Sequence, residues 1–361
     1  MNTPTITKPA AAAQLPSVPF TRAALPQVQP GNVDVSTVMS ASSTQLGPYD
    51  VPAIGFLRYL FVQVSASGGT GTAAVYKEDA PFSAISEIAL TDVNGAPIVG
   101  PISGYDLYLI NKYGGYTGFS DPKTMPSYTA PTSGNFAFCL RVPVELGSRD
   151  GVGALPNMNA SSTYKLRITQ AATTEVFSTN PTGLPTLRFQ VFTEAWSGPL
   201  PIGPNGESQA QTPPAEGTTQ MWSKMVLPAA AAFNTLQLRR VGNYIRNIII
   251  VGRNTSDGLR SDTNLPSTLQ WFIDNGQWLN ESQVYRKQLM RERLIGQTNG
   301  PDTGVLVYDF TSEFDGIYGG ELRNWLPTIQ STRLELQGTF AAAQNVTILT
   351  NDVAVKGNPF I

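Results

Sequence analysis

The chain has 361 residues, of which 24 are basic and 26 acidic, and its formal net charge of −2 leaves no global field that would draw it to nucleic acid or an anionic membrane. Histidine is absent and Cys139 is the single cysteine, so Ser-His and Cys-His nucleophile pairs, cysteine-rich metal sites and an intrachain disulfide are excluded. The length is sufficient for two medium domains, each with its own core.

The first segment, residues 1–33, is rich in Pro, Ala, Thr and Gln and carries Lys8 and Arg22 but no acidic residue. Such a segment buries too little apolar area to offset the entropy lost on ordering, so we expect a flexible N-terminal arm that is either disordered or ordered by contact with a neighbour. The segment lacks the apolar core of a signal peptide, and no stretch of the chain approaches the ~20 apolar residues of a membrane helix. We therefore expect a soluble protein made in a cytoplasm.

Residues 34–196 are predicted to form the first domain. Cys139 lies in NFAFCLRVPVEL, where apolar residues alternate with smaller or polar ones as in a half-buried strand, and nothing nearby in the sequence would stabilise a thiolate, so we expect an inert thiol. The signals of this domain run, in order, through the strand FLRYLFVQVSAS, an Asn94-Gly95 turn, the helix-like SGYDLYLINKYGG, the Cys139 strand, an Asp150-Gly151 loop, the step Leu155-Pro156 and the strand YKLRIT.

Residues 197–219 are rich in Pro and Gly and are predicted to be a linker. After it, residues 220–355 repeat the order of signals, and residues 356–361 form a C-terminal tail. Matching turns lie 165 to 181 residues apart, which indicates a tandem duplication of one domain. The repeated signals are the strand NYIRNIIIVGRN, an Asn275-Gly276 turn, a helix over residues 281–295, the strand GVLVYDF, an Asp315-Gly316 loop, the step Leu326-Pro327 and the strand TRLELQG.

Strands dominate both halves. Patterns of period two, bounded by Gly, Pro and Asn-Gly turns, are typical of antiparallel hairpins and not of βαβ units. Each half has the size and rhythm of about eight short strands interrupted by one helix. The predicted fold is therefore all-β, with two tandem eight-stranded antiparallel jelly rolls, each with a short helical insertion.

The ordered signals, from YLFVQVSAS through ALTDVNGAPIVGPISGYDLYLINKYGG and RVPVELGSRDGVGALPNMNASSTYKLRIT to VLVYDF and RLELQGTF, resemble those of the tectivirus-type double jelly-roll major capsid proteins, over about residues 30 to 350. The resemblance implies two upright jelly rolls per subunit and a homotrimer with a pseudo-hexagonal outline. It also implies an icosahedral shell, usually around a lipid vesicle and double-stranded DNA, in which the subunit contacts itself, other capsid proteins such as a vertex protein, and the internal membrane through its arm. A trimer of duplicated domains offers six similar edges, which suits a hexagonal net.

Five residues are candidates for arm or lattice contacts. The helix 281–295 is basic, yet its apolar pairs Tyr285 with Leu289 and Met290 with Leu294 favour packing or subunit contacts over binding to nucleic acid, and no sequence-specific nucleic acid is expected. No catalytic residue, metal or cofactor is predicted. The five candidates are Lys8, Phe20, Arg22, Arg286 and Arg293.

Three other functions are compatible with the sequence. The first alternative is a carbohydrate-binding or adhesive β-sandwich, in which loop aromatics such as Tyr113, Tyr116, Trp278 and Trp325 would stack on sugars. A glycosidase with two carboxylates does not need histidine. The acids in DFTSEFDG, residues 309–316, could bind calcium, although their spacing does not match a calcium loop and solvated acids are the preferred interpretation.

Overall fold

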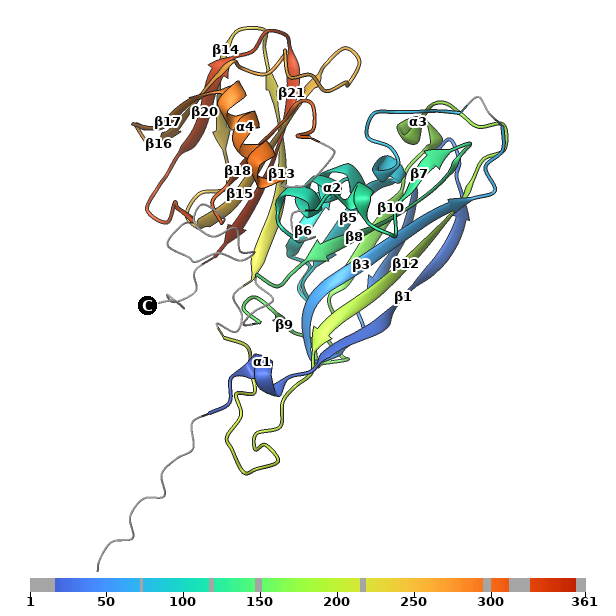
Figure 1. The fold of residues 1–361 in the computed structure, drawn as a ribbon, viewed down its shortest axis with the longest axis vertical. Coiled ribbons are helices and arrows are strands. Elements are labelled where there is room, and N and C mark those ends of the chain that lie inside the picture. The colour runs from blue at the N-terminus through green and yellow to red at the C-terminus, as the bar shows by residue number, and fades with distance from the viewer. Residues whose placement is uncertain are drawn as a thin grey trace, which may run out of the picture.

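The structure is a computed structural model that describes residues 17–71, 74–116, 120–146, 151–214, 219–294, 300–311 and 325–354. Figure 1 shows two β units side by side, one from the first half of the chain and one from the second. We call them the first and the second barrel. Among the described residues, no helix combines the length and the apolar composition needed to cross a bilayer.

The first barrel consists of two antiparallel sheets that enclose a core. Its strands are β1 (Pro26–Val38), β2 (Thr44–Asp50), β3 (Phe56–Ser67), β4 (Val75–Tyr76), β5 (Ile85–Thr91), β6 (Pro97–Ile102), β7 (Thr129–Thr132), β8 (Asn135–Pro143), β9 (Leu155–Pro156), β10 (Lys165–Gln170), β11 (Phe177–Thr179) and β12 (Thr186–Trp196). Its helices are α1 (Phe20–Ala23), α2 (Gly104–Tyr113), α3 (Thr173–Val176) and the 3-10 turns Phe82–Ala84 and Pro122–Thr124. One sheet has the order β1-β12-β3-β8-β7, and the other β6-β5-β10-β2.

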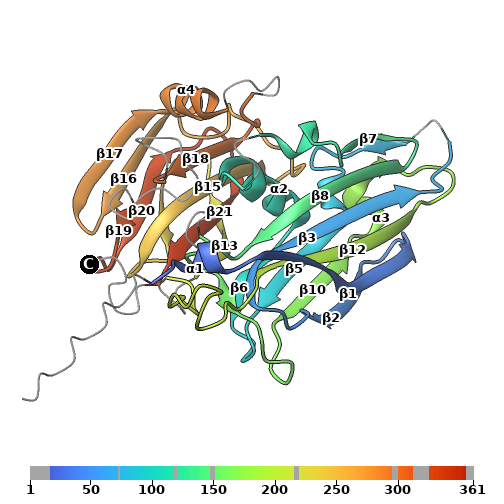
Figure 2. The ribbon, with the colours of Figure 1, turned by 60° about the horizontal axis from the view of Figure 1, so that its bottom comes forward.

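The second barrel has the same construction. Its elements are β13 (Gln220–Ala229), β14 (Phe233–Leu238), β15 (Tyr244–Asn254), β16 (Thr268–Ile273), β17 (Gly276–Ser282), α4 (Gln283–Arg293), β18 (Val305–Asp309), β19 (Leu326–Pro327), β20 (Leu334–Thr339) and β21 (Gln344–Val353). The orders β13-β21-β15-β18 and β14-β20-β16-β17 match β1-β12-β3-β8 and β2-β10-β5-β6 of the first barrel (Figure 2). In each barrel a helix follows the fifth of these eight strands. The predicted fold, two eight-stranded jelly rolls with a helical insertion each, is confirmed.

Two sequence signals of the duplication occupy equivalent places. Leu155 and Pro156 pair with β3, and Leu326 and Pro327 pair with β15, the counterpart of β3. The two Asn-Gly turns connect β5 to β6 and β16 to β17. The Asp315-Gly316 loop and Asp150 lie outside the described residues. The structural repeat therefore extends to single residues.

The same irregularities of register recur in both barrels. Between β12 and β3 the register skips Arg58, and between β21 and β15 it skips Arg246. Between β5 and β6 it skips Ile98, and between β16 and β17 it skips Trp278. Since a β-bulge adds one unpaired residue to one strand, shared bulges give a residue-by-residue correspondence between the barrels.

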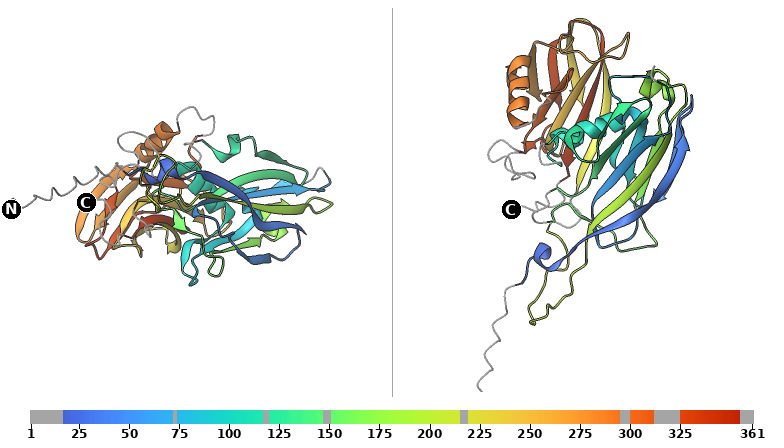
Figure 3. Two further views of the ribbon diagram at one scale, coloured as in Figure 1. Left: turned by 90° about the horizontal axis from the view of Figure 1, so that it is seen from below. Right: turned by 45° about the vertical axis from the view of Figure 1, so that its right-hand side comes forward.

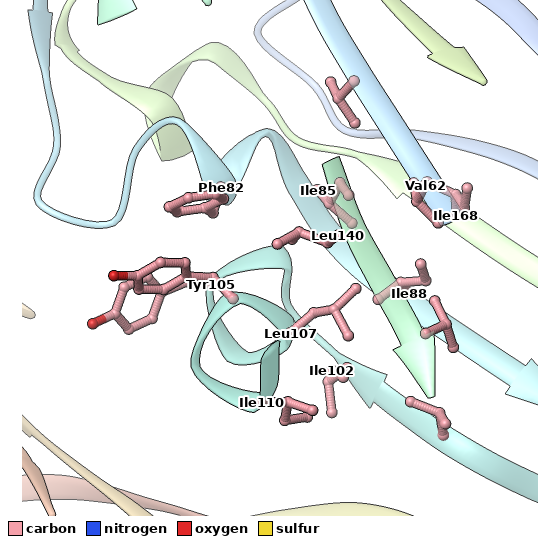
Figure 4. Packing of buried hydrophobic residues seen from close by; sticks show 14 of the residues in the cluster. Val62, Phe82, Ile85, Ile88, Ile102, Tyr105, Leu107, Ile110, Leu140 and Ile168 are labelled. Carbon is pink, nitrogen blue, oxygen red and sulfur yellow. The ribbon is translucent and has the colours of Figure 1, made fainter. Parts of the chain in front are cut away.

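The core of the first barrel continues into the second barrel. In β8, Phe136, Phe138 and Leu140 are buried while Cys139 between them is partly exposed, so the predicted alternation is confirmed. Figure 4 shows Leu107 of α2 directed toward the sheet residues. The Phe82 ring stacks on Tyr108 of the same helix, with ring centroids 4.2 Å apart. Side chains from the second barrel, among them Val251, Val307 and Leu349, belong to the same apolar cluster.

Residues 20–33 differ from the predicted arm. Phe20 packs against Phe56 and Trp196, with ring centroids 5.2 and 6.4 Å apart, and β1 pairs with β12 from Pro26 onward. The prolines of this segment fit because β1 is an edge strand, where a residue without an N–H is tolerated. Residues 1–16 lie outside the described residues. The domain boundaries expected from the sequence stay predictions.

The predicted linker has some regular pairing. Ile202 forms a bridge with Ser208, and Gln209 forms a parallel bridge with Val18, just before α1. This part of the chain and α1 lie together at one end of the molecule, at the bottom of Figure 1. Residues 215–218 lie outside the described residues.

Candidate assembly surface

The helix α2 forms the junction between the two barrels. Its N-cap is Ser103, whose hydroxyl accepts the N–H of Asp106 at 3.1 Å, while the Asp106 carboxylate accepts the N–H of Ser103 at 2.9 Å. All residues of α2 are buried. A helix at a protein surface leaves one face in water, so this burial requires cover on both sides. Figure 3 shows α2 between the barrels and α4 on the outer side of the second barrel.

Buried ion pairs connect α2 to the second barrel. The Lys112 ammonium, whose side chain is 1% exposed, lies 2.8 Å from Asp302 Oδ2 and 3.0 Å from Asp121 Oδ2. The hydroxyl of Tyr113 donates to Asp302 at 2.8 Å. Burial by itself raises the pKa of Asp302, but the charge and hydrogen bonds of Lys112 and Tyr113 outweigh burial and hold that pKa below its usual value. Asp302 is therefore a largely buried carboxylate whose ionised form is stabilised by Lys112 and Tyr113.

A second polar network closes the other side of the junction. Gln220, at the start of β13, accepts from the hydroxyl of Tyr116 and from Arg246 Nη1 at 3.0 Å, and its amide donates to the carbonyl of Glu145 at 2.7 Å. The Trp222 indole donates to the Tyr116 hydroxyl at 3.3 Å. Tyr116 and Glu145 belong to the first barrel, so this network holds both barrels in one arrangement.

The corresponding helix of the second barrel, α4, is differently buried. Its N-cap is Ser282, whose hydroxyl accepts the N–H of Tyr285 at 3.2 Å, as Ser103 does for Asp106. Val284 is 78% exposed and Tyr285 is 55% exposed, although the same positions of α2 are buried. α4 thus presents apolar side chains to solvent where α2 is covered by a barrel.

Two strand edges are also uncovered. Within the chain, β6 and β13 pair in parallel at Val99 and Trp222, which joins the sheets of the two barrels. β17 and β1, which hold the places of β6 and β13, are edge strands, and Val28 of β1 is 62% exposed. Exposed edge strands offer unpaired backbone groups to another chain. α4, β17 and β1 together are the candidate assembly surface.

No protein-family description and no curated protein sequence matches this chain. Solved structures do. The STIV MCP superposes with a TM-score of 0.65 at 16% sequence identity, over 92% of this chain and 97% of that one. The major capsid protein P2 from bacteriophage PM2 gives 0.54 at 10% identity, over 92% and 99% of the two chains. The PBCV-1 virus capsid gives 0.56 at 11% identity, over 91% and 93%.

The chain has the double jelly-roll fold of viral major capsid proteins. The resemblance read from the order of turns and strands is thus confirmed for the fold, across most of the chain and at identities far below those that reveal a relative by sequence. In this double jelly-roll fold, α4, β17 and β1 are open in the single chain, whereas their counterparts α2, β6 and β13 meet at the junction of the two barrels.

The residues predicted as contacts are dispersed over this fold. Phe20 is buried within its own chain, and Arg22 is exposed on α1. Arg286 makes two 2.7 Å bonds to Glu281 and lies over the Tyr308 ring at 4.2 Å, so it serves the second barrel itself. Arg293 is the last residue of α4, and Lys8 lies outside the described residues. Their roles as contacts stay predictions.

Sequence reasoning missed the open surface. Tyr285 was expected to pack with Leu289, yet it is exposed, while Met290 and Leu294 are buried as expected. Val284 could have indicated this surface in the sequence. It is an apolar residue next to Tyr285, and the two together make the apolar stripe of the helix wider than the side that faces its own barrel.

The double jelly roll uses most of the aromatics proposed for sugar binding as core. Tyr113, Tyr116 and Trp325 are buried, while Trp278 is 39% exposed. Asp309, expected to be a solvated acid, is buried instead and accepts from Asn247 Nδ2 at 2.8 Å, because it ends β18, a strand whose residues are all buried. Among the described residues no group of three potential metal ligands occurs. The other acids of that stretch, Glu313 and Asp315, lie outside the described residues.

Proposed function

We propose that this chain is the major coat subunit of an icosahedral virus shell and that it acts by self-assembly, not by catalysis. The observation that carries the proposal is the duplicated jelly roll, shared over most of the chain with viral major capsid proteins. A coat subunit needs repeated edges more than it needs a reactive centre, and the duplication provides them.

The subunit forms a homotrimer with a pseudo-hexagonal outline. Three copies of two equivalent barrels present six similar edges, so the trimer fits a hexagonal net by a closed ring inside and weaker contacts outside. The exposed Val284 and Tyr285 of α4 support a ring, since a solitary subunit would leave them in water. The trimers build the shell of a tailless double-stranded DNA virus, made in the host cytoplasm.

The N-terminal segment contacts neighbouring trimers or an internal viral membrane, with Lys8 and Arg22 as its cations, and a vertex protein completes the shell. Flotation with phosphatidylcholine vesicles that contain an anionic lipid tests the membrane contact. Replacing Lys8 and Arg22 by alanine should reduce flotation, whereas replacing the exposed Lys77 and Arg239 should not. Equal flotation of both variants would reject a role for these two cations.

Light scattering of the purified chain at two ionic strengths tests the trimer. We expect a mass near three times 38.8 kDa that salt does not change, followed by hexagonal arrays in electron micrographs. A stable monomer at micromolar concentration would contradict the proposal and favour a binding module.

A further inference from the structure

We infer that the subunit interface of the trimer repeats the barrel junction inside the chain: α4 and β17 of one copy contact β1 of the next copy, as α2 and β6 contact β13 within one copy. The inference rests on the proposed trimer and specifies which surfaces form it. The partner is a second copy of this chain, held head to tail.

The shared bulges identify the equivalent residues. The register at Ile98 and Trp278 makes Val99 equivalent to Leu279. The register at Arg58 and Arg246 likewise makes β1 equivalent to β13. It follows that Val28 of β1 is equivalent to Trp222 of β13, and Pro30 to Lys224.

The in-chain strand contact then predicts its counterpart. Val99 pairs in parallel with Trp222 inside the chain, so Leu279 of one copy should pair in parallel with Val28 of the next. Leu279 lies on the edge strand β17 and Val28 lies on the edge strand β1. Both edges are free in the single chain, and pairing them covers both at once.

In the helix contact, both members of an ion pair inside the chain are replaced by uncharged residues at the equivalent positions of the proposed interface. In the chain, Asp106 of α2 lies 2.6 Å from the Lys224 ammonium of β13. The N-cap relation makes Tyr285 equivalent to Asp106, and Lys224 is equivalent to Pro30. An ion pair inside the chain therefore corresponds to an aromatic residue facing a proline between chains, with no charge left unpaired on either side.

A second pair of positions at the helix is also less charged in the proposed interface than inside the chain. Tyr105 of α2 lies near the guanidinium groups of Arg260 and Arg253, at 4.5 and 5.4 Å. Val284 is equivalent to Tyr105, and Ser65 of β3 is equivalent to Arg253 through the common register of β3 and β15. Val284 has no aromatic ring and Ser65 has no charge, so the interface between copies is less charged at this pair of positions too.

Cysteine cross-linking tests the strand contact in the full chain with Cys139→Ala as background. Oxidation of an equimolar mixture of Val28→Cys and Leu279→Cys proteins, after subunit exchange, should join the two chains, because paired strands hold Cα atoms within disulfide range. Each protein alone should stay unlinked. Val38→Cys mixed with Leu279→Cys is the matched control, because Val38 is ten residues further along β1, about 33 Å at 3.3 Å per residue.

An ion-pair transplant tests the helix contact independently. Tyr285→Asp should weaken each interface about tenfold, and hence raise the dissociation constant of a ring with three interfaces about a thousandfold. Adding Pro30→Lys recreates the Asp106 and Lys224 pair between copies and should restore most of that loss. Val75→Asp, at a similarly exposed apolar site on the first barrel, should leave the trimer unchanged.

The outcomes separate this inference from the proposed function. A trimer that shows neither the mixed cross-link nor rescue by Pro30→Lys would overturn the interface and leave the coat role standing. Cross-linking of Val28→Cys protein with itself would indicate a two-fold contact and also overturn it. If the unmodified chain forms no trimer, the proposed function and the interface both fail.

Discussion

Replacing Lys112 by methionine should strongly destabilise the chain, because Lys112 is, among the described residues, the ion-pair partner of two carboxylates in the barrel junction. Methionine keeps most of the side-chain volume and removes the charge. Asp121 is fully buried and Asp302 nearly so, and both would lose their counter-ion.

The expected loss can be estimated in two ways. Removing one partner of a buried ion pair costs about 3 to 5 kcal/mol. Alternatively, the variant can protonate one carboxyl group. For an ordinary aspartate pKa of about 3.9, protonation costs about 4 kcal/mol at pH 7 and about 1.5 kcal/mol at pH 5, at 1.36 kcal/mol per pH unit. Both estimates agree at neutral pH, and the second adds that the loss should shrink as the pH falls.

Urea unfolding followed by tryptophan fluorescence, at one fixed protomer concentration, measures this loss at pH 7 and pH 5. Lys165→Met is the matched control, since the Lys165 and Asp50 side chains are about half exposed, and its effect should be far smaller and independent of pH. A loss of less than about 1 kcal/mol at pH 7, or equal losses at both pH values, would refute the reasoning.

Three further predictions concern single residues. Gly55→Ala should cost several times more stability in urea unfolding than Gly95→Ala: both have positive φ, but a Cβ at Gly55 would lie 1.8 Å from the Trp196 carbonyl oxygen, whereas one at Gly95 meets nothing within 4 Å. Equal losses would contradict this. Asp302 has a lowered pKa in the folded chain, so its contribution to the free energy of unfolding is complete above the pKa of the unfolded chain and is lost as the pH falls through the pKa of the folded chain. Asp302→Asn should therefore make the free energy of unfolding fall less steeply with decreasing pH at acid pH, and an unchanged slope would count against this reasoning. Burial raises the Cys139 pKa from 9.0 to about 11, so a thiol reagent at pH 8 should react about a hundredfold more slowly than with an ordinary thiol until the chain unfolds, and immediate reaction would be inconsistent with the buried strand.

Local patterns predicted the elements well where one face of a strand is buried. β8 alternates because its sheet faces the core on one side only. β15 and β21 are buried along nearly their whole length, since the first barrel covers the face that the core of the second leaves open. The apolar run of β15 indicated a strand but not which neighbour covers it.

The contact residues were harder to predict. Arg286 is basic in a basic helix, yet its charge is neutralised by Glu281, five residues away and beyond the usual helical spacing. Phe20 lies in a proline-rich segment, yet Trp196 and Phe56 bury it. Composition describes a segment in isolation, and both outcomes depend on partners brought from elsewhere in the chain.

By itself, the amino-acid sequence determined that two similar β domains follow one another, because turns at Asn-Gly and Leu-Pro and the period-two strands are set by neighbouring residues. Only the tertiary structure decided that α2 is enclosed while α4 is open, and that β6 meets β13 while β17 and β1 stay free. The reason is physical. Equivalent local sequences fold alike, but which surfaces are covered depends on contacts between residues more than a hundred positions apart, and a single chain has only one junction for its two barrels.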